Sequence, residues 1–282
     1  MNQKTLKHLC LEHTGKLSDK WEIYLSEYER IFYEYRGRPV SLLEIGVQNG
    51  GSLEIWSKYF PIAQKLVGCD INPKCCLLEY KDSRIAVVIG DANTDTVQAQ
   101  VLGHAPTFQI VIDDGSHQSG DIVKSFCRYF PCLSDDGVFI AEDLHCSYWR
   151  EFQGGLFYPH SSMEFFKRLA DIVNHEHWGA KRSHADILKR FTSKYEVRIS
   201  DEILQHIHSL EFINSMCVIR KANPECNRLG ARLISGSEDK VVSGLLSRNG
   251  SQYQVPAQGL RHFCNWWCRK TAKHVLGRHW SL

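Results

Sequence analysis

The chain has 282 residues, of which 43% are hydrophobic and 23% charged, and this ordinary globular composition excludes disordered, collagen-like and coiled-coil proteins. No apolar stretch could span a bilayer or serve as a secretory signal, and the eleven irregularly spaced cysteines include no CxxC pair, so we predict a reducing, cytoplasmic protein. Residues 1–239 hold 27 basic and 32 acidic residues, a net charge of −5, which argues against nucleic-acid binding.

Residues 1–38 are predicted to form an N-terminal helical segment. Within the helical pattern of residues 4–36, aromatic side chains recur at mostly three- and four-residue spacing. These are Trp21, Tyr24, Tyr28, Phe32 and Tyr35. Such a stripe is typical of the face with which a helix packs against a protein core.

Residues 39–221 are predicted to form the main domain, in which β-rich runs alternate with helical patterns. The expected strands cover residues 40–45, 65–70, 85–91, 108–114 and 137–143. Helices are expected from Ser52 to Pro61, in a stretch that ends near Leu102, and from Gly120 to Leu133. Strands that are apolar throughout are typical of a parallel sheet covered on both faces, so the alternation indicates a doubly wound, Rossmann-like α/β fold.

The second half of this domain is predicted to close the sheet. Helices are expected at residues 161–175 and 184–191, and closing strands, one of them antiparallel, at 195–199 and 212–220. Residues 222–259 are rich in Gly, Ser and Asn and are predicted to be a linker or loop.

Residues 260–282 are predicted to form a basic amphipathic C-terminal helix. Its apolar residues recur at roughly helical spacing, and after Asp239 the chain holds seven basic residues and no acidic one. Two alternatives remain open for this tail: peripheral contact with an anionic inner membrane face or a partner, and docking on the acidic body. Whether the chain forms a homo-oligomer is also left open.

Each predicted strand of the parallel sheet ends in an acidic residue. These acids are Glu44, Asp70, Asp91, Asp113 with Asp114, and Glu142 with Asp143. Ligands of open α/β sheets bind beyond the carboxyl ends of the strands, so the acids are expected to line the functional cleft.

The loop after the first predicted strand is placed where a backbone approaches a ligand closely. It does not match the GxGxxG dinucleotide fingerprint, because Gln48 replaces the second glycine, and a nicotinamide dehydrogenase therefore ranks last. Asp70 is placed to bind the ribose hydroxyls of an adenosine, and Asp91 its adenine amino group. S-adenosylmethionine, an adenosine without phosphates, fits this pattern. The residues predicted to bind it are Glu44, Gly46, Gly50, Asp70, Asp91 and Asp113.

Two motifs at neighbouring strand ends predict a metal site. Asp114 lies in the run Asp-Asp-Gly-Ser-His that ends at His117, and Glu142 is followed by Asp143. Three convergent carboxylates repel one another unless a cation intervenes, and all-oxygen ligation favours Mg²⁺, Ca²⁺ or Mn²⁺. His117, on the same loop as Asp114, is a candidate general base because imidazole titrates near neutral pH.

A family resemblance rests on these motifs together with others between residues 13 and 221. They include Leu-Leu-Glu-Ile-Gly-Val from Leu42, Asp19-Lys20-Trp21, Ile-Val-Ile-Asp-Asp-Gly-Ser-His from Ile110, and Glu-Asp-Leu-His-Cys-Ser-Tyr-Trp from Glu142. The chain resembles the metal-dependent sugar O-methyltransferases of macrolide biosynthesis, which are class I methyltransferases, and shares motifs with the cephalosporin hydroxylases.

The resemblance implies a Mg²⁺-assisted O-methyltransferase that acts on a hydroxyl of a sugar or glycan. It assigns metal binding to Asp114, Glu142 and Asp143, and the role of base to His117. The chain is expected to depart from the family's pattern in two places. Its glycine loop has fewer glycines, and its N-terminal region is short, without the family's auxiliary domain. Both departures affect the expected substrate and oligomeric form more than the expected chemistry.

Two other functions remain open. A non-haem iron hydroxylase would use His117, His145 and Asp114 as a two-histidine, one-carboxylate site. A non-catalytic module would bind S-adenosylmethionine and recruit a partner through its tail.

Overall fold

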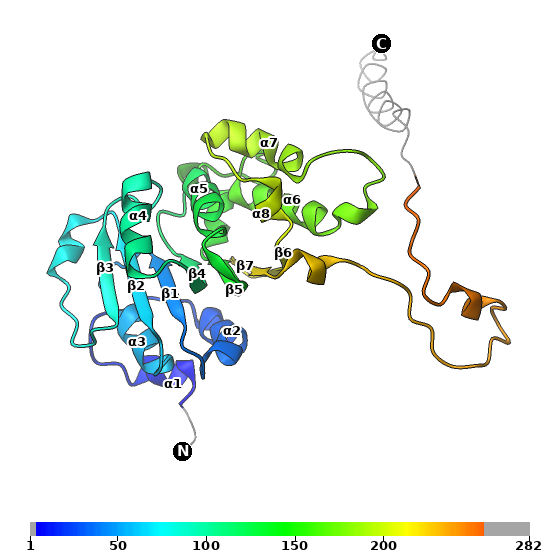
Figure 1. Cartoon of the computed structure of the whole chain (residues 1–282). Coiled ribbons are helices and arrows are strands. Elements are labelled where there is room, and N and C mark those ends of the chain that lie inside the picture. Colours follow the sequence, from blue (N-terminus) through cyan, green and yellow to red (C-terminus); the bar gives the residue numbers. More distant parts are fainter. Residues whose placement is uncertain (1–3, 257–282) are drawn as a thin grey trace, which may run out of the picture. The chain divides into compact units, whose positions relative to one another are not determined.

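The computed structural model describes residues 4–256 and divides them into two compact units. The first unit contains the described residues up to Val173 together with His184–Asn227. Its strands are β1 (Ser41–Ile45), β2 (Lys65–Asp70), β3 (Ile85–Ile89), β4 (Phe108–Asp113), β5 (Leu133–Ala141), β6 (Ile207–Ile213) and β7 (Met216–Lys221). They form one sheet in the order β3-β2-β1-β4-β5-β7-β6 (Figure 1).

The doubly wound α/β fold is confirmed. Strands β1 to β5 pair in parallel, with Leu43 of β1 opposite both Val67 and Val111, while β7 runs antiparallel to β5 and to β6. Every residue of β1 is buried, as expected for a central strand covered on both faces.

The helices cover both faces of this sheet. They are α1 (Leu6–Leu11), α2 (Glu22–Phe32), α3 (Gly51–Tyr59), α4 (Asp95–His104), α5 (Ser119–Tyr129), α6 (Ser162–Val173), α7 (His184–Tyr195) and α8 (Asp201–Leu204). Short 3₁₀ turns are η1 (Tyr33–Tyr35), η2 (Pro73–Leu77), η3 (Leu144–Tyr148), η4 (Arg150–Phe152), η5 (His175–His177), η6 (Pro224–Asn227) and η7 (Leu245–Arg248). Helices α1 to α3 pack on one face, and α4 to α7 pack on the other (Figure 1).

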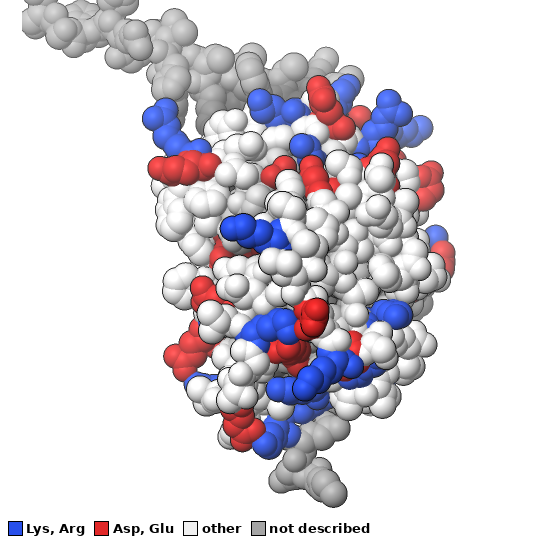
Figure 2. Space-filling view, turned by 90° about the vertical axis from the view of Figure 1, so that its left-hand side faces the viewer, with Lys and Arg blue, Asp and Glu red and all other residues white. Residues whose placement is uncertain are grey.

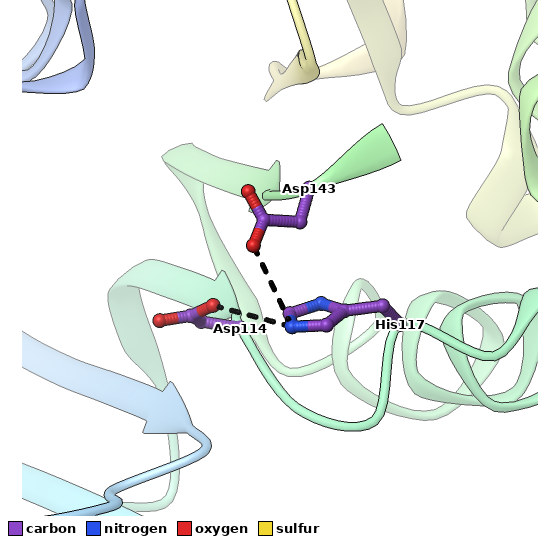
Figure 3. A group of neighbouring side chains, drawn as sticks. All are labelled: Asp114, His117 and Asp143. Atoms are coloured by element: carbon purple, nitrogen blue, oxygen red, sulfur yellow. Dashed lines mark ion pairs between the residues drawn. The ribbon is translucent and has the colours of Figure 1, made fainter. Parts of the chain in front are cut away.

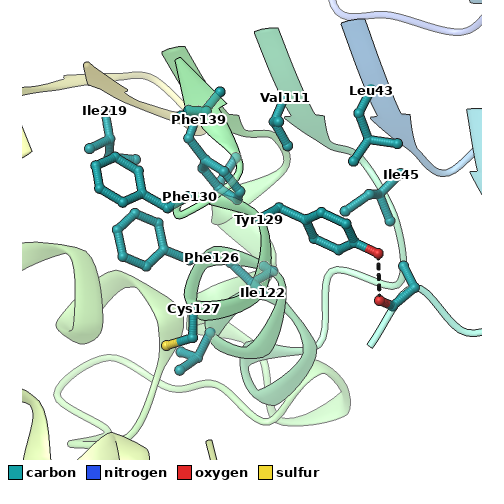
Figure 4. Close-up of a cluster of buried hydrophobic side chains, with 14 of the residues drawn as sticks. Leu43, Ile45, Val111, Ile122, Phe126, Cys127, Tyr129, Phe130, Phe139 and Ile219 are labelled. Atoms are coloured by element: carbon teal, nitrogen blue, oxygen red, sulfur yellow. Dashed lines mark hydrogen bonds between the residues drawn. The ribbon is translucent and has the colours of Figure 1, made fainter. Parts of the chain in front are cut away.

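Phe126 of α5 lies at the centre of the core between α5 and the sheet (Figure 4). Its ring stacks on Phe130 at 4.8 Å and meets Phe139 of β5 and Phe165 of α6 edge-on at 5.3 and 5.4 Å. The neighbouring Tyr129 hydroxyl donates a hydrogen bond of 2.7 Å to the Ala92 carbonyl oxygen, which ties α5 to the loop after β3.

The N-terminal segment is helical in two pieces rather than continuously. Helices α1 and α2 are separated by residues 12–21, where the turn-forming Gly15 and Ser18 interrupt the helical pattern. The Leu17 carbonyl accepts a hydrogen bond of 3.1 Å from the Gly51 amide, so this connection lies against the start of α3. The expected aromatic packing face is buried except for Trp21, which is 58% exposed.

Two expectations for the second half of the sheet were wrong. Residues 195–199 do not form a strand: α7 extends to Tyr195, and Val197 and Ile199 pack against the core from irregular backbone. The strand expected at 212–220 is instead parts of two, because the chain turns at Ser215, whose φ of 68° is left-handed. The hairpin of β6 and β7 results.

The second unit comprises Asn174–Ser183 and the chain from Arg228 onward. Between Arg228 and residue 256 it contains the single turn η7 and no strand, and the expected helix at 260–282 lies outside the described residues. No helix between residues 4 and 256 is long and apolar enough to cross a membrane. On the face in Figure 2, acidic and basic side chains are intermixed over the described surface.

Candidate active site

A cavity of about 630 Å³ opens at the carboxyl ends of the parallel strands. It lies where the strand order reverses between β1 and β4, the place at which open α/β sheets bind their ligands. Its walls come from the connection before α2 and from the loops after β1 to β5. Eight of the ten predicted site residues line it: Gly46, Asp70, Asp91, Asp113, Asp114, His117, Glu142 and Asp143.

Gly46 brings the loops after β1 and β4 into contact. Its φ is +94°, and a Cβ atom there would lie only 2.0 Å from the Asp114 carbonyl oxygen. The Asp114 amide in turn donates to the Ile45 carbonyl at 2.9 Å. Glycine is therefore required at this position for the two strand ends to meet.

Asp70 holds the glycine loop in place. Its Oδ2 accepts hydrogen bonds from the amides of Val47 and Gln48 at 2.7 and 2.9 Å, and its Oδ1 accepts one from Asn72 at 2.8 Å. Asp91, at the end of β3, is exposed on the cavity wall and accepts a bond from the Asn93 amide at 2.9 Å. Both acids line the region predicted for the nucleoside.

Glu44 and Gly50 are not on the cavity wall, contrary to expectation. Gly50 begins α3 with a φ of +81°, and a Cβ atom there would lie 2.1 Å from the Tyr80 hydroxyl, so packing explains this glycine. Glu44 is fully buried, and its Oε2 accepts a hydrogen bond of 2.6 Å from the Ser52 hydroxyl. Ser52 is the second residue of α3, so this bond ties the start of the helix to β1.

Asp113 is the buried member of the Asp113–Asp114 pair. Burial raises the pKa of its carboxyl group to about 7. Its Oδ2 is buried without a hydrogen-bond partner among the described residues, although the side chain belongs to the cavity wall. A buried oxygen of this kind is placed to meet a polar group of a bound ligand.

Asp114, His117 and Asp143 converge in the wall of the cavity, where their side chains point toward one another (Figure 3). The His117 Nε2 atom lies 3.6 Å from Asp143 Oδ2 and 4.0 Å from Asp114 Oδ1, and all three potential ligand atoms lie within 4.8 Å of one another. His117 and Asp143 have φ values of 56° and 52°. Left-handed backbone at non-glycine residues is costly and is concentrated at functional sites.

Glu142 is more buried than Asp114 and Asp143. It pairs with Lys20, which was not among the predicted site residues. The Lys20 ammonium lies 2.8 Å from Glu142 Oε1, 2.5 Å from Asp114 Oδ2 and 3.5 Å from Glu44 Oε1, and its side chain is 7% exposed. Burial disfavours this charge, but attraction from the carboxylates, chiefly Glu142, outweighs it and raises the pKa of Lys20 well above its ordinary value. Burial also raises the pKa of Glu142.

One ammonium cannot balance these acids. Glu44, Asp114 and Glu142 surround Lys20, and Asp143 adds a further carboxylate nearby. Carboxylates this close repel one another unless cations or protons intervene. The oxygen-rich donor set therefore fits a hard divalent cation such as Mg²⁺ or Mn²⁺.

Three aromatic residues of the N-terminal segment also reach these acids. The Trp21 indole donates to Asp143 Oδ1 at 3.0 Å, the Tyr24 hydroxyl donates to the same oxygen at 2.9 Å, and the Tyr28 hydroxyl donates to Glu142 Oε1. The sequence signal was present for two of them, since Tyr24 and Tyr28 are four residues apart on α2 and so share one helical face. The polar ends of this packing face were overlooked.

His145, required for an iron site, has a different environment. Its Nδ1 atom lies 2.5 Å from the Ser215 hydroxyl and 3.9 Å from Asp143 Oδ1. Within the described chain, the cluster whose side chains could together hold a metal consists of Asp114, His117 and Asp143, and it includes neither His145 nor the predicted ligand Glu142.

Known proteins with similar sequences include O-methyltransferases, in agreement with the resemblance predicted from the motifs. No family model matches the chain. It is 36% identical over 187 residues to the 8-demethyl-8-alpha-L-rhamnosyl tetracenomycin-C 2'-O-methyltransferase of Streptomyces olivaceus, covering 62% of this chain and 47% of that protein. It is 34% identical over 164 residues to the mycinamicin VI 2''-O-methyltransferase of Micromonospora griseorubida, covering 54% and 40%. The chain spans about half the length of these curated relatives or less.

The fold is similar to that of MycE, a methyltransferase of the mycinamycin biosynthetic pathway solved with Mg, SAH and mycinamycin VI. The TM-score is 0.65 at 25% identity, and the match covers 79% of this chain and 55% of that one. In sequence and in fold, the chain is thus similar to the class I sugar O-methyltransferases, and the predicted resemblance to them is confirmed.

Proposed function

We propose that the protein is an S-adenosylmethionine-dependent, Mg²⁺-assisted O-methyltransferase that acts on a hydroxyl group of a sugar. The observation that carries this proposal is the convergence of Asp114, His117 and Asp143 in the wall of the cavity. The named relatives that methylate sugar hydroxyls, and the solved relative with Mg and SAH, support the same assignment.

The methyl donor is assigned to the loops after β1 to β4. Asp70 and Asp91 would accept hydrogen bonds from the nucleoside, and the unpartnered Oδ2 of Asp113 lies in the same wall. Gly46 lies in the same wall and keeps the loops after β1 and β4 in contact. A cavity of this size is ordinary for a cofactor site.

The metal ion is assigned to Asp114, Glu142 and Asp143. When bound, a divalent cation lowers the pKa of a sugar hydroxyl and fixes its orientation. His117 is the base: its Nε2 atom faces the carboxylates and accepts the hydroxyl proton as that oxygen attacks the sulfonium methyl group. The loops after β1 to β5 would hold the methyl donor and the sugar hydroxyl in line for transfer. Such positioning lowers the activation barrier of a reaction by several kcal/mol.

Transfer of labelled methyl groups tests the proposal. Purified protein is incubated with labelled S-adenosylmethionine, a panel of nucleotide sugars and glycosylated acceptors, and either Mg²⁺ or EDTA. We expect label transfer only with the metal, about 10²- to 10⁴-fold slower turnover in His117→Gln, and unchanged cofactor binding by calorimetry. The control is His104→Gln, an exposed histidine at the end of α4.

Three results would contradict this assignment: transfer that persists in EDTA, full activity of His117→Gln, or strict dependence on Fe²⁺ and O₂, which would favour a hydroxylase. Loss of cofactor binding in Asp114→Asn would argue that this residue holds the methyl donor and not a metal ion. The cytoplasmic location, the membrane or partner contact of residues 260–282, and homo-oligomer formation stay predictions.

A further inference from the structure

The N-terminal segment contacts each of the three proposed metal-binding carboxylates. Lys20 binds Asp114 Oδ2 and Glu142 Oε1, and Tyr28 donates to the same Glu142 oxygen. Trp21 and Tyr24 donate to Asp143 Oδ1. These contacts join residues that are 94 to 122 positions apart in sequence, on the segment before α2, on α2 and at the ends of β4 and β5.

The contacts divide the six carboxylate oxygens into two groups. One oxygen of each acid, namely Asp114 Oδ2, Glu142 Oε1 and Asp143 Oδ1, is held by the N-terminal segment. None of the hydrogen bonds between residues 4 and 256 uses the other oxygen of each acid, namely Asp114 Oδ1, Glu142 Oε2 and Asp143 Oδ2. Two of these three unheld oxygens face His117 Nε2.

We infer that Lys20, Trp21, Tyr24 and Tyr28 are positioning residues, which hold one oxygen of each acid and so leave Asp114 Oδ1 and Asp143 Oδ2, the two oxygens beside His117 Nε2, to meet the metal ion. The inference rests on the proposed function, because it presupposes a divalent cation at this site. It goes beyond that function by giving these four residues of the N-terminal segment a role in orienting the acids of the site.

Physical chemistry explains why such a shell is needed. A carboxylate on a free side chain rotates and can present either oxygen, and hydrogen bonds from fixed donors remove this freedom. Lys20 also neutralises part of the charge that would otherwise push Asp114 and Glu142 apart. The aromatic donors are themselves fixed: Tyr24 and Tyr28 have fully buried rings, and Tyr28 stacks on Phe32 at 4.8 Å.

Binding of Mn²⁺ alone tests the inference in the full chain. Tyr24→Phe and Tyr28→Phe remove one hydroxyl each and keep the buried ring. Trp21→Phe alters a side chain that is 58% exposed, so its folding is not at risk. We expect each variant to bind Mn²⁺ about 10- to 100-fold more weakly than the wild type, measured by electron paramagnetic resonance of the free ion.

The matched control is Tyr35→Phe. This tyrosine is equally buried, but its hydroxyl donates to the Asp136 carbonyl at 2.6 Å, away from the acids of the site. Its Mn²⁺ affinity should equal that of the wild type. The metal-free unfolding temperature of the three test variants should stay close to that of this control, which separates positioning from general loosening of the fold.

The outcomes distinguish the inference from the proposed function. Wild-type affinity in Tyr24→Phe, Tyr28→Phe and Trp21→Phe overturns the inference and leaves the methyltransferase assignment standing. An equal loss in Tyr35→Phe also overturns it, since the effect would then be structural. A wild-type protein that binds no Mn²⁺ overturns both.

Discussion

Asp113 and Asp114 are adjacent in sequence but have opposite environments. The Asp114 side chain is 22% exposed and paired with Lys20, whereas Asp113 is buried and forms no ion pair with any residue from 4 to 256. Burial therefore disfavours ionisation of Asp113 and raises its pKa to about 7. This carboxyl group is protonated in the folded protein over a pH range in which it is ionised in the unfolded chain.

The free energy of unfolding should therefore fall as the pH rises, because Asp113 loses its proton. The group has a pKa of about 4 in an unfolded chain, so its contribution is complete below that pH and is lost as the pH rises through about 7. The full effect is of the order of 4 kcal/mol. In Asp113→Asn, which cannot ionise, this loss should be missing. Urea unfolding of both proteins in EDTA at pH 5 and pH 8 measures it, and a constant difference between them would refute the assignment.

The acids of the site were predictable, but the residues that hold them were not. Parallel strands bring their carboxyl ends to one edge, so the positions of Asp114, Glu142 and Asp143 follow from topology alone. Lys20 reaches them from a segment about a hundred residues earlier. Its path over the strand ends depends on the packing of α2, which no local pattern reveals.

At the level of elements, buried strands were the easiest part to predict. The strands β1 to β4 start within one residue of their predicted positions, because a short apolar run bounded by turn residues is typical of a buried strand. The region around residues 195–220 was harder. The hairpin of β6 and β7 depends on a turn at Ser215, and this turn position has no glycine to mark it in the sequence.

Helix α5 shows how strongly one element depends on a single side chain. Phe126 lies at the contact between α5, β5 and α6, so Phe126→Ala should leave a cavity and lower the free energy of unfolding by about 3–5 kcal/mol. Phe157→Ala, at a side chain that is 85% exposed, should have little effect. Denaturant unfolding of both variants checks this, and equal midpoints would be inconsistent with the packing described.

For the whole molecule, the cluster of carboxylates around Lys20 predicts that a bound cation stabilises the fold. A ligand that binds only the folded state at 100 times its dissociation constant adds about 2.7 kcal/mol. We therefore expect Mg²⁺ to raise the unfolding temperature, S-adenosylmethionine to raise it further, and EDTA to reverse only the metal's part.

Asp114→Asn serves as the comparison in the same thermal scans. It should lose the response to Mg²⁺ and keep the response to S-adenosylmethionine. A variant that still responds to Mg²⁺ in full would place the ion elsewhere on the protein.

The reach of Tyr24 across the chain has a consequence for biosynthesis. Its hydroxyl lies 3.0 Å from the Ser215 carbonyl, 191 residues later, and also binds Asp143. While the ribosome is still translating the middle of the message, α2 has already emerged, but the partners of Tyr24 at Asp143 and Ser215 have not yet been synthesised. In a nascent polypeptide, Tyr24 thus lacks its Ser215 partner until the β6–β7 hairpin leaves the exit tunnel, and only then can this contact form.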